Sequence, residues 1–315
     1  MIRWVFIVCF LPLVAPSYGQ QDPQFTQYMF NNLYYNPGYS GVEGVTKFTS
    51  LFRSQWTGYE PTFYGGGAPT TFLLSFTAPL FKLNSGVGAY ILNDKLGPQT
   101  NQEIQVSYAY HLGFKESKLS FGIRVGMFAQ TIDSDLYNAI HKDDELLPQQ
   151  GKVTQIKPDV AAGVFYRKEK FYVGAGFSHL TKAKFDFGLN QRNTLETHTY
   201  VTGGYFHEVN FDLKLQFMTL IKSDFVKTQF DVGAIAYVKD TMWGGLSFRQ
   251  SEAAIILLGW SFLKDKSLKA GYSMDIIVKD RAAKQPLSHE LMLSFELPVT
   301  PAVGKKVIRT PRYRH

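Results

Sequence analysis

The segment from Glu103 to Leu112 alternates apolar and polar side chains, and this alternation most constrains the fold. Successive side chains of a β-strand point to opposite faces, so the segment makes a ribbon with one apolar face and one polar face. The pattern resumes after a turn, from Leu119 to Met127, and similar ribbons recur to near the end of the chain. The fold must therefore cover many apolar strand faces at once.

The first residues predict export. Residues 1–19 hold one cation, Arg3, then an apolar run from Trp4 to Val14, and they end in small residues at Ser17 and Gly19. This is the pattern of a secretory signal peptide cleaved after Gly19. The alternative is a membrane anchor, but the apolar run is too short to span a bilayer as a helix. The single cysteine lies within this segment, so the mature chain is predicted to have no disulfide and no thiolate metal site.

Residues 20–44 differ from the rest of the chain, and we predict a periplasmic segment that acts as a lid or plug. Apolar residues from Phe25 to Leu33 recur at helical spacing. Asp22 can cap the first turn with Pro23 at the first helical position, and the sequence Asn36-Pro37-Gly38 ends the pattern. These features predict one short amphipathic helix ahead of the first strand.

Residues 45–297 are predicted to form a single domain of about fourteen strands. No segment after the first nineteen residues is apolar for long enough to make a membrane-spanning helix. The expected strands are 45–56, 70–80, 86–93, 103–112, 118–130, 158–167, 170–180, 196–207, 211–221, 225–238, 241–249, 253–262, 267–278 and 287–297.

Loop lengths and strand charges favour a transmembrane antiparallel β-barrel over a soluble sandwich. The connections 57–69, 94–102, 131–157, 181–195 and 279–286 are mostly long and alternate with short ones, as the outer loops and periplasmic turns of outer-membrane barrels do. A sandwich would bury the in-strand charges at a cost, whereas a polar lumen accepts them. Both signs occur on the polar faces, which predicts internal ion pairs and a filled lumen rather than a selective pore. The predicted lumen charges are Arg53, Arg124, Asp212, Lys214, Lys227, Asp231, Arg249, Lys269, Asp275, Glu290 and Glu296.

The sequence offers no pattern typical of a catalytic, cofactor or metal site, and we expect none. Its histidines lack the spacing of a helical zinc site, and Ser178-His179 alone does not make a nucleophile with its base. Acidic residues in the loop 131–157 leave two alternatives open, a solvated loop or a calcium site. The net charge of +7 owes much to the tail 298–315, and an exported chain predicts no nucleic-acid partner. That basic tail is predicted to be periplasmic, either as part of a docking surface or as a solvated extension.

Several short motifs together resemble one family. They are Asp22-Pro23-Gln24-Phe25-Thr26-Gln27-Tyr28, Asn36-Pro37-Gly38, Ser40-Gly41, Arg53-Ser54-Gln55-Trp56 and Ser288-His289-Glu290. The chain resembles the PorP/SprF family of type IX secretion and gliding-associated outer-membrane proteins of Bacteroidota, with Thr26 where the family has serine. The family-motif positions are Asp22, Pro23, Phe25, Gln27, Tyr28, Asn36, Pro37, Gly41, Arg53, Gln55, Trp56, His289 and Glu290.

The resemblance implies a non-enzymatic barrel in the outer membrane of a Gram-negative bacterium. Implied partners are outer-membrane lipid, the periplasmic type IX secretion and motor subunits, and for some members a large secreted surface adhesin. The function predicted is a link between the secretion apparatus and exported or surface-anchored adhesins. The alternative is an outer-membrane channel for small hydrophobic or polar nutrients.

Overall fold

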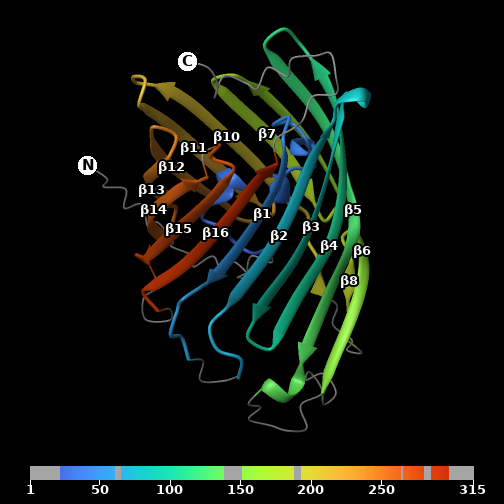
Figure 1. The fold of residues 1–315 in the computed structure, drawn as a ribbon. Helices are drawn as coiled ribbons and strands as arrows, with labels where there is room; N and C mark the ends of the chain where they lie inside the picture. The colour runs from blue at the N-terminus through green and yellow to red at the C-terminus, as the bar shows by residue number, and fades with distance from the viewer. Residues whose placement is uncertain are drawn as a thin grey trace, which may run out of the picture.

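The computed structural model of the protein describes residues 22–60, 65–137, 151–187, 193–263, 265–279 and 285–297. Within them, fourteen antiparallel strands form a closed barrel in sequence order, with β7 pairing with β10 and β1 closing against β16 (Figure 1). The predicted fourteen-stranded barrel is confirmed. The predicted signal peptide, the basic tail 298–315 and residues 138–150 of the acidic loop lie outside the described residues.

Most strands match the predicted ranges to within three residues, but β4 and β6 begin four and six residues earlier than predicted, and β8 and β9 form a small separate hairpin. The strands are β1 (Thr46–Ser54), β2 (Thr70–Leu80), β3 (Ser85–Leu96), β4 (Gln99–Gly113), β5 (Ser117–Asp133), β6 (Lys152–Lys168), β7 (Phe171–Ser178), β8 (Lys184–Phe185), β9 (Asn193–Thr194), β10 (His198–Glu208), β11 (Leu213–Ser223), β12 (Thr228–Val238), β13 (Met242–Arg249), β14 (Ala253–Phe262), β15 (Leu268–Ile277) and β16 (Leu287–Leu297). Short helices are η1 (Tyr28–Phe30), α1 (Asn32–Tyr35), η2 (Pro37–Tyr39), η3 (Phe81–Leu83) and η4 (Ser134–Leu136). Among the described residues no helix is long and apolar enough to cross a membrane.

The alternation seen in the sequence becomes the two faces of the barrel wall. In β4, Ile104 is 65% exposed on the outside, whereas its neighbour Gln105 is 1% exposed and faces the lumen. The same outward row of β4 and β5 includes Val106, Ile123 and Met127, all exposed. An apolar outer surface facing lipid, with a polar interior, is the arrangement of a transmembrane barrel.

The two ends of the barrel differ. The short-turn end, at the top of Figure 1, carries the connections 81–84, 114–116, 169–170, 209–212, 239–241 and 263–267. The long-loop end, at the bottom, carries 55–69, 97–98, 134–151, 179–197, 224–227, 250–252 and 278–286. The four longest connections, 55–69, 134–151, 179–197 and 278–286, all join strands at the same end, as the extracellular loops of outer-membrane barrels do.

The structure corrects one predicted connection and the placement of two predicted lumen charges. The expected outer loop 94–102 is a turn at Gly97 and Pro98, because β3 and β4 continue through polar residues. Asp94, which the sequence placed in that loop, is buried in β3 and accepts a hydrogen bond from Thr71. Two of the predicted lumen charges, Asp212 and Lys227, instead lie exposed in turns.

The described part of the N-terminal segment lies inside the barrel, and we call residues 22–45 the plug (Figure 1). The prediction of one amphipathic helix was wrong, because the plug contains three separate turns, η1, α1 and η2. Asn31 and Asn36 stand between these turns and bond to the barrel wall or to the plug itself. Since Phe25, Tyr28 and Leu33 are all buried, the plug has no solvent-facing side of the kind an amphipathic helix needs.

Candidate functional site

The plug fills the lumen by packing aromatic side chains against the wall. Phe25 meets Tyr34 edge-to-face at 5.3 Å between ring centroids, and Tyr35 meets Tyr200 of β10 at 5.1 Å. Phe30 of η1 lies 5.5 Å from the ring of Trp243 on β13. Buried aromatic pairs of this kind add to the apolar burial, so they hold the plug in one arrangement.

Thr26 and Gln27 fix the first part of the plug to acidic residues of the wall. The backbone amides of Thr26 and Gln27 each donate to a carboxylate oxygen of Glu290 on β16 at 2.8 Å. The Thr26 hydroxyl donates to Asp275 on β15 at 2.8 Å. One carboxylate thus satisfies two buried backbone donors that would otherwise be costly to leave unpaired.

Two buried arginines balance these carboxylates. Arg53 donates to Asp275 at 2.7 Å and to the Thr26 hydroxyl at 2.8 Å. Arg249 donates to Asp231 at 2.9 Å and to Asp275 at 3.1 Å. Together with Glu290, these side chains form a closed ion network around Thr26, which confirms that the lumen holds internal ion pairs. A buried charge is tolerated only when it is paired in this way.

A third arginine holds the middle of the plug. Arg124 of β5 donates to the backbone oxygen of Tyr34 at 2.6 Å and to the Ser178 hydroxyl at 2.8 Å. Its guanidinium lies 5.0 Å from the ring centroid of Tyr90, whose hydroxyl donates to Glu103 at 2.7 Å. Arg124 therefore links a helix-terminal carbonyl of the plug to three strands of the wall.

Glycines in the wall let the plug backbone approach closely. A Cβ atom on Gly122 would lie 2.3 Å from the backbone nitrogen of Gly38, and one on Gly86 would lie 2.2 Å from the backbone oxygen of Ser40. A Cβ atom on Gly176 would lie 2.1 Å from the backbone oxygen of Tyr35. Any side chain at these positions would displace the plug, which explains glycines inside strands.

The last part of the plug is tied to the wall near the short-turn end. The side-chain amide of Asn36 donates to the Val164 carbonyl at 2.9 Å, and the side-chain oxygens of Ser40 and Ser107 lie 2.8 Å apart. The Gly41 amide donates to Thr77 at 2.7 Å, with Gly41 in the left-handed region at φ 68°. The chain then enters β1.

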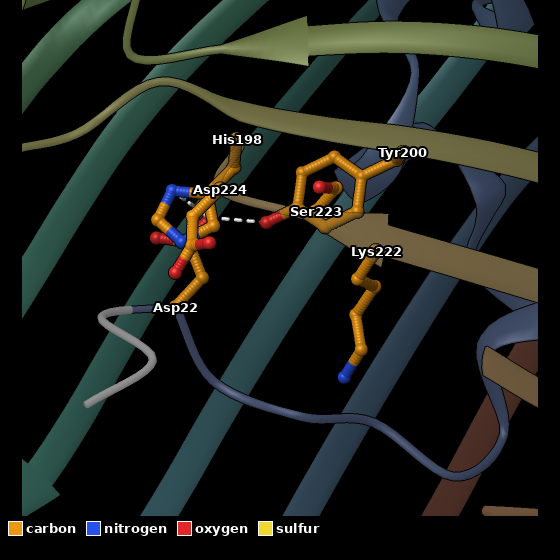
Figure 2. A pocket seen from close by; sticks show the side chains of 6 residues that line it. All are labelled: Asp22, His198, Tyr200, Lys222, Ser223 and Asp224. Atoms are coloured by element: carbon orange, nitrogen blue, oxygen red, sulfur yellow. Dashed lines mark hydrogen bonds and ion pairs between the residues drawn. The ribbon is translucent and has the colours of Figure 1, made fainter. Parts of the chain in front are cut away.

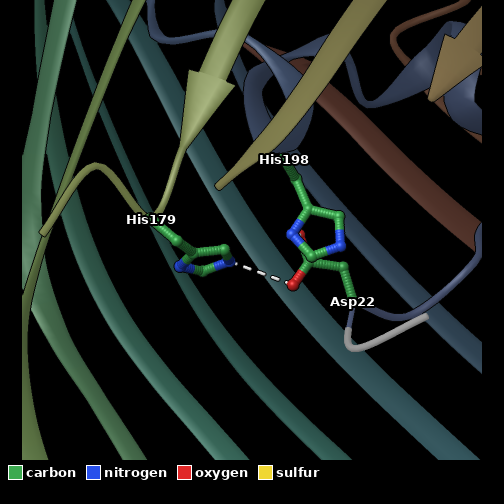
Figure 3. Close-up of side chains that lie close together, drawn as sticks. All are labelled: Asp22, His179 and His198. Carbon is green, nitrogen blue, oxygen red and sulfur yellow. Dashed lines mark hydrogen bonds and ion pairs between the residues drawn. The ribbon is translucent and has the colours of Figure 1, made fainter. Parts of the chain in front are cut away.

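The other end of the plug begins at Asp22, within a cluster of ring side chains (Figures 2 and 3). The Asp22 carboxylate accepts hydrogen bonds from His179 Nε2 at 2.9 Å and from the Tyr200 hydroxyl. His198 Nδ1 lies 3.8 Å from the same carboxylate, and His179 Nδ1 lies 3.2 Å from Asp159 of β6. A small pocket lined by Asp22, His198, Tyr200, Lys222, Ser223 and Asp224 adjoins the cluster.

The sequence from residue 17 to residue 295 matches the model of the family described as type IX secretion system membrane protein PorP/SprF. The match covers the plug and nearly the whole barrel. The chain belongs to the PorP/SprF family. It is therefore an outer-membrane component of the type IX secretion system, and the resemblance seen in the motifs is confirmed.

Solved structures share the fold at very low sequence identity. This PorP/SprF barrel is similar to a TodX deltaS2S3 mutant monoaromatic hydrocarbon channel, with 10% identity and a TM-score of 0.50. The match covers 84% of this chain and 93% of that one. It is also similar to the Ralstonia pickettii toluene transporter TbuX, with 10% identity and a TM-score of 0.49, over 84% of this chain and 93% of that one. The Acinetobacter baumannii outer membrane protein Omp33 has 9% identity and a TM-score of 0.44, over 82% of this chain and 100% of that one. The likeness to the TodX mutant shows the barrel fold alone. No curated protein matches the chain.

Most of the PorP/SprF motif residues lie in the plug or where the wall meets it. Gln27, Arg53 and Glu290 are brought together around Thr26, whereas Asp22 joins the histidine cluster. Phe25, Tyr28, Asn36, Pro37 and Gly41 are buried along the plug, and Pro23 lies half-buried at its start.

Three motif residues lie away from the lumen network. The Gln55 amide donates to Pro69, and the Trp56 amide donates to the Ser288 hydroxyl at 2.9 Å, so both fix the long-loop end of β1. His289 lies on the outward face of β16, where its ring stacks on Tyr272 with Nδ1 2.7 Å from the hydroxyl. The motif therefore contains both plug-binding and wall-stabilising positions.

Sequence analysis missed His179, His198 and Tyr200 as partners of Asp22. His179 and His198 flank the connection from β7 to β10, and Asp22 lies 157 positions before His179. No local spacing signals a contact between residues so far apart. The hydroxyl of Ser178, next to His179, accepts a hydrogen bond from Arg124.

Proposed function

We propose that this PorP/SprF barrel is a non-enzymatic scaffold that links type IX secretion subunits in the periplasm with an exported or surface-anchored adhesin. The supporting observation is the plug, which occupies the lumen and is bonded to the wall at Asp22, Thr26, Tyr34 and Gly41. A lumen closed in this way leaves the two ends of the barrel as the surfaces for partners.

The family's place in type IX secretion supports a division of the proposed partners between the two ends of the barrel. Outer-membrane barrels turn their short connections to the periplasm and their longer loops outward. The short-turn end would then bind the secretion and motor subunits, and the long-loop end would bind the exported protein. Among the described short turns, Lys115 stands beside Glu116 and Lys239 beside Asp240, whereas the turn 81–84 carries Lys82 alone and the turn 209–212 carries Asp212 alone. Taken together, the short turns carry charges of both signs, so we expect shape and apolar contact to contribute to docking there.

Two exposed phenylalanines provide a matched test of this assignment. Phe211 is 83% exposed in the turn 209–212 at the short-turn end, and Phe225 is 73% exposed in the turn 224–227 at the long-loop end. Both flank the same strand, β11. Each would be replaced in turn by a photoreactive phenylalanine analogue in the full chain, in intact cells.

Light should attach periplasmic secretion subunits to the chain labelled at position 211 and an exported surface protein to the chain labelled at position 225. The same partners at both positions would show that the ends are not separate docking surfaces. If neither secretion subunits nor a surface protein are captured, and the barrel passes ions across a planar bilayer, the scaffold proposal fails and the alternative of a nutrient channel is favoured.

A further inference from the structure

The cluster at the start of the plug has the features of a metal-binding site. We propose that Asp22, His179 and His198 bind one divalent transition-metal ion, with zinc the best match to the donors. One ligand atom from each of the three residues lies within 4.8 Å of the other two (Figure 3). The proposal goes beyond the scaffold role and does not depend on it.

The spacing of the donor atoms suits a tetrahedral ion. Bonds of about 2.0–2.1 Å to zinc place two ligand atoms about 3.3 Å apart in tetrahedral geometry. His179 Nε2 lies 2.9 Å from one Asp22 oxygen, and His198 Nδ1 lies 3.8 Å from the other. The two distances reach different oxygens of the carboxylate, so a rotation of the Asp22 side chain that brings one oxygen toward both nitrogens would complete the coordination.

The scaffold around the histidines is rigid. His198 begins β10, where it pairs with Ser178, the residue before His179. The Thr197 hydroxyl donates to the His179 carbonyl at 3.3 Å, which ties the two ends of the connection together. His179 adopts φ 58°, a left-handed conformation uncommon for a residue other than glycine. Local strain of this kind is often maintained where a side chain must be aimed at a site.

Groups behind the donors resemble the supporting residues of metal sites. Asp159 Oδ1 lies 3.2 Å from His179 Nδ1, the nitrogen opposite the proposed ligand atom, as in a carboxylate–histidine–metal arrangement. The Tyr200 hydroxyl donates to the Asp22 carboxylate and would orient it. Both supporting side chains are buried.

One ring nitrogen of His198 has a hydrogen-bond partner among the described residues and the other does not. Its Nδ1 lies 3.0 Å from the Glu196 carbonyl oxygen, while its buried Nε2 has no hydrogen-bond partner among the described residues. On metal binding, the ring proton would move from Nδ1 to Nε2, and Nδ1 would give up its contact with the Glu196 carbonyl to bind the ion. The fourth coordination position would open toward the pocket beside Lys222 (Figure 2).

The donor set discriminates among ions. Calcium and magnesium take mainly oxygen ligands, so two imidazoles do not suit them. Two imidazoles with a carboxylate are ligands that zinc commonly takes. Copper and nickel also bind imidazole, so they would compete for the same site. A bound zinc ion would fix the first described residue of the plug to β10 and to the end of β7.

The test measures zinc binding by the full chain, refolded in detergent and stripped with a chelator. Zinc would be titrated in competition with a chromophoric chelator. We expect one ion per chain, at least tenfold weaker binding in Asp22→Asn and in His198→Gln, and no change in His207→Gln. His207 lies exposed on the same strand as His198 and serves as the matched control.

Cobalt provides an independent readout of geometry. The wild-type chain should give the visible absorption of tetrahedral cobalt, and the two ligand variants should lose it. Zinc should also raise the unfolding temperature of the wild type in a concentration-dependent way. A folded wild-type chain that takes up no stoichiometric zinc would overturn the proposal, whatever the variants do. Equal affinity in the wild type, Asp22→Asn and His198→Gln would overturn it as well, by placing the ion elsewhere.

Discussion

Arg53 of β1 lies 2.7 Å from the carboxylate of Asp275 on β15, and neither side chain is more than 1% exposed. The strand between them, β16, contributes Glu290, which Arg53 also contacts at 3.4 Å. The same Asp275 carboxylate accepts a hydrogen bond from the hydroxyl of Thr26 in the plug. The pair therefore couples the stability of the barrel wall to the position of the plug.

Replacing Arg53 with alanine should lower the free energy of unfolding by about 3–5 kcal/mol, because the buried carboxylates of Asp275 and Glu290 each lose a cationic partner. Urea-induced unfolding of the refolded barrel in detergent, followed by tryptophan fluorescence, would measure the change. The control is Lys168→Ala, which breaks an exposed pair with Glu116 at 3.3 Å and should cost at most about 1 kcal/mol. Similar costs for the two variants would contradict a coupled network in the lumen.

Replacing Gly122 with alanine should displace the plug without opening the barrel. The new Cβ atom would lie 2.3 Å from the backbone of Pro37 and Gly38, and overpacking of a filled interior costs about 1–3 kcal/mol. Limited proteolysis should then cut the plug in the variant and spare it in the wild type. Gly113→Ala is the control, since nothing lies within 4 Å of its added carbon. A protected plug in Gly122→Ala would mean that the wall can shift to make room.

The barrel itself could be predicted because its signal is local. In β4, neighbouring residues Ile104 and Gln105 point to opposite faces whatever the rest of the chain does, so period-two alternation identifies both the strand and its faces. Arg53 and Glu290 were assigned to the lumen in this way. Their contact with each other and with Thr26 depends on barrel closure, which no short segment encodes.

The plug was predicted less well because tertiary contacts decide its shape. Helical spacing from Phe25 to Leu33 suggested one helix, yet Asn31 interrupts it and accepts a hydrogen bond from Ser75 of the wall. Asp22, expected to cap that helix, bonds to His179 instead. Backbone groups of a buried segment must find partners, and here the wall supplies many of them.

Replacing Ile104 with arginine should impair membrane assembly. Ile104 lies in the middle of β4 on the apolar outer face, where an arginine costs about 2–4 kcal/mol at the bilayer midplane. The fraction of chain that folds into lipid vesicles, read from the heat-dependent shift in gel mobility, would report the loss. Phe211→Arg at the short-turn end is the control and should fold like the wild type. Equal folding of both variants would argue that this face of β4 does not meet lipid.

Deleting residues 22–40 should turn a closed barrel into a conducting one. The fourteen strands and their pairing do not include the plug, so the wall can still close. The freed lumen would be lined by Arg53, Arg124 and Arg249 together with their carboxylate partners, all of which water would then solvate. Planar-bilayer recordings should give stepwise currents for the deletion variant and none for the full chain. Currents of equal size from both would mean that ions pass around the plug, whereas a folded deletion variant without current would mean that the wall collapses into the space the plug had filled.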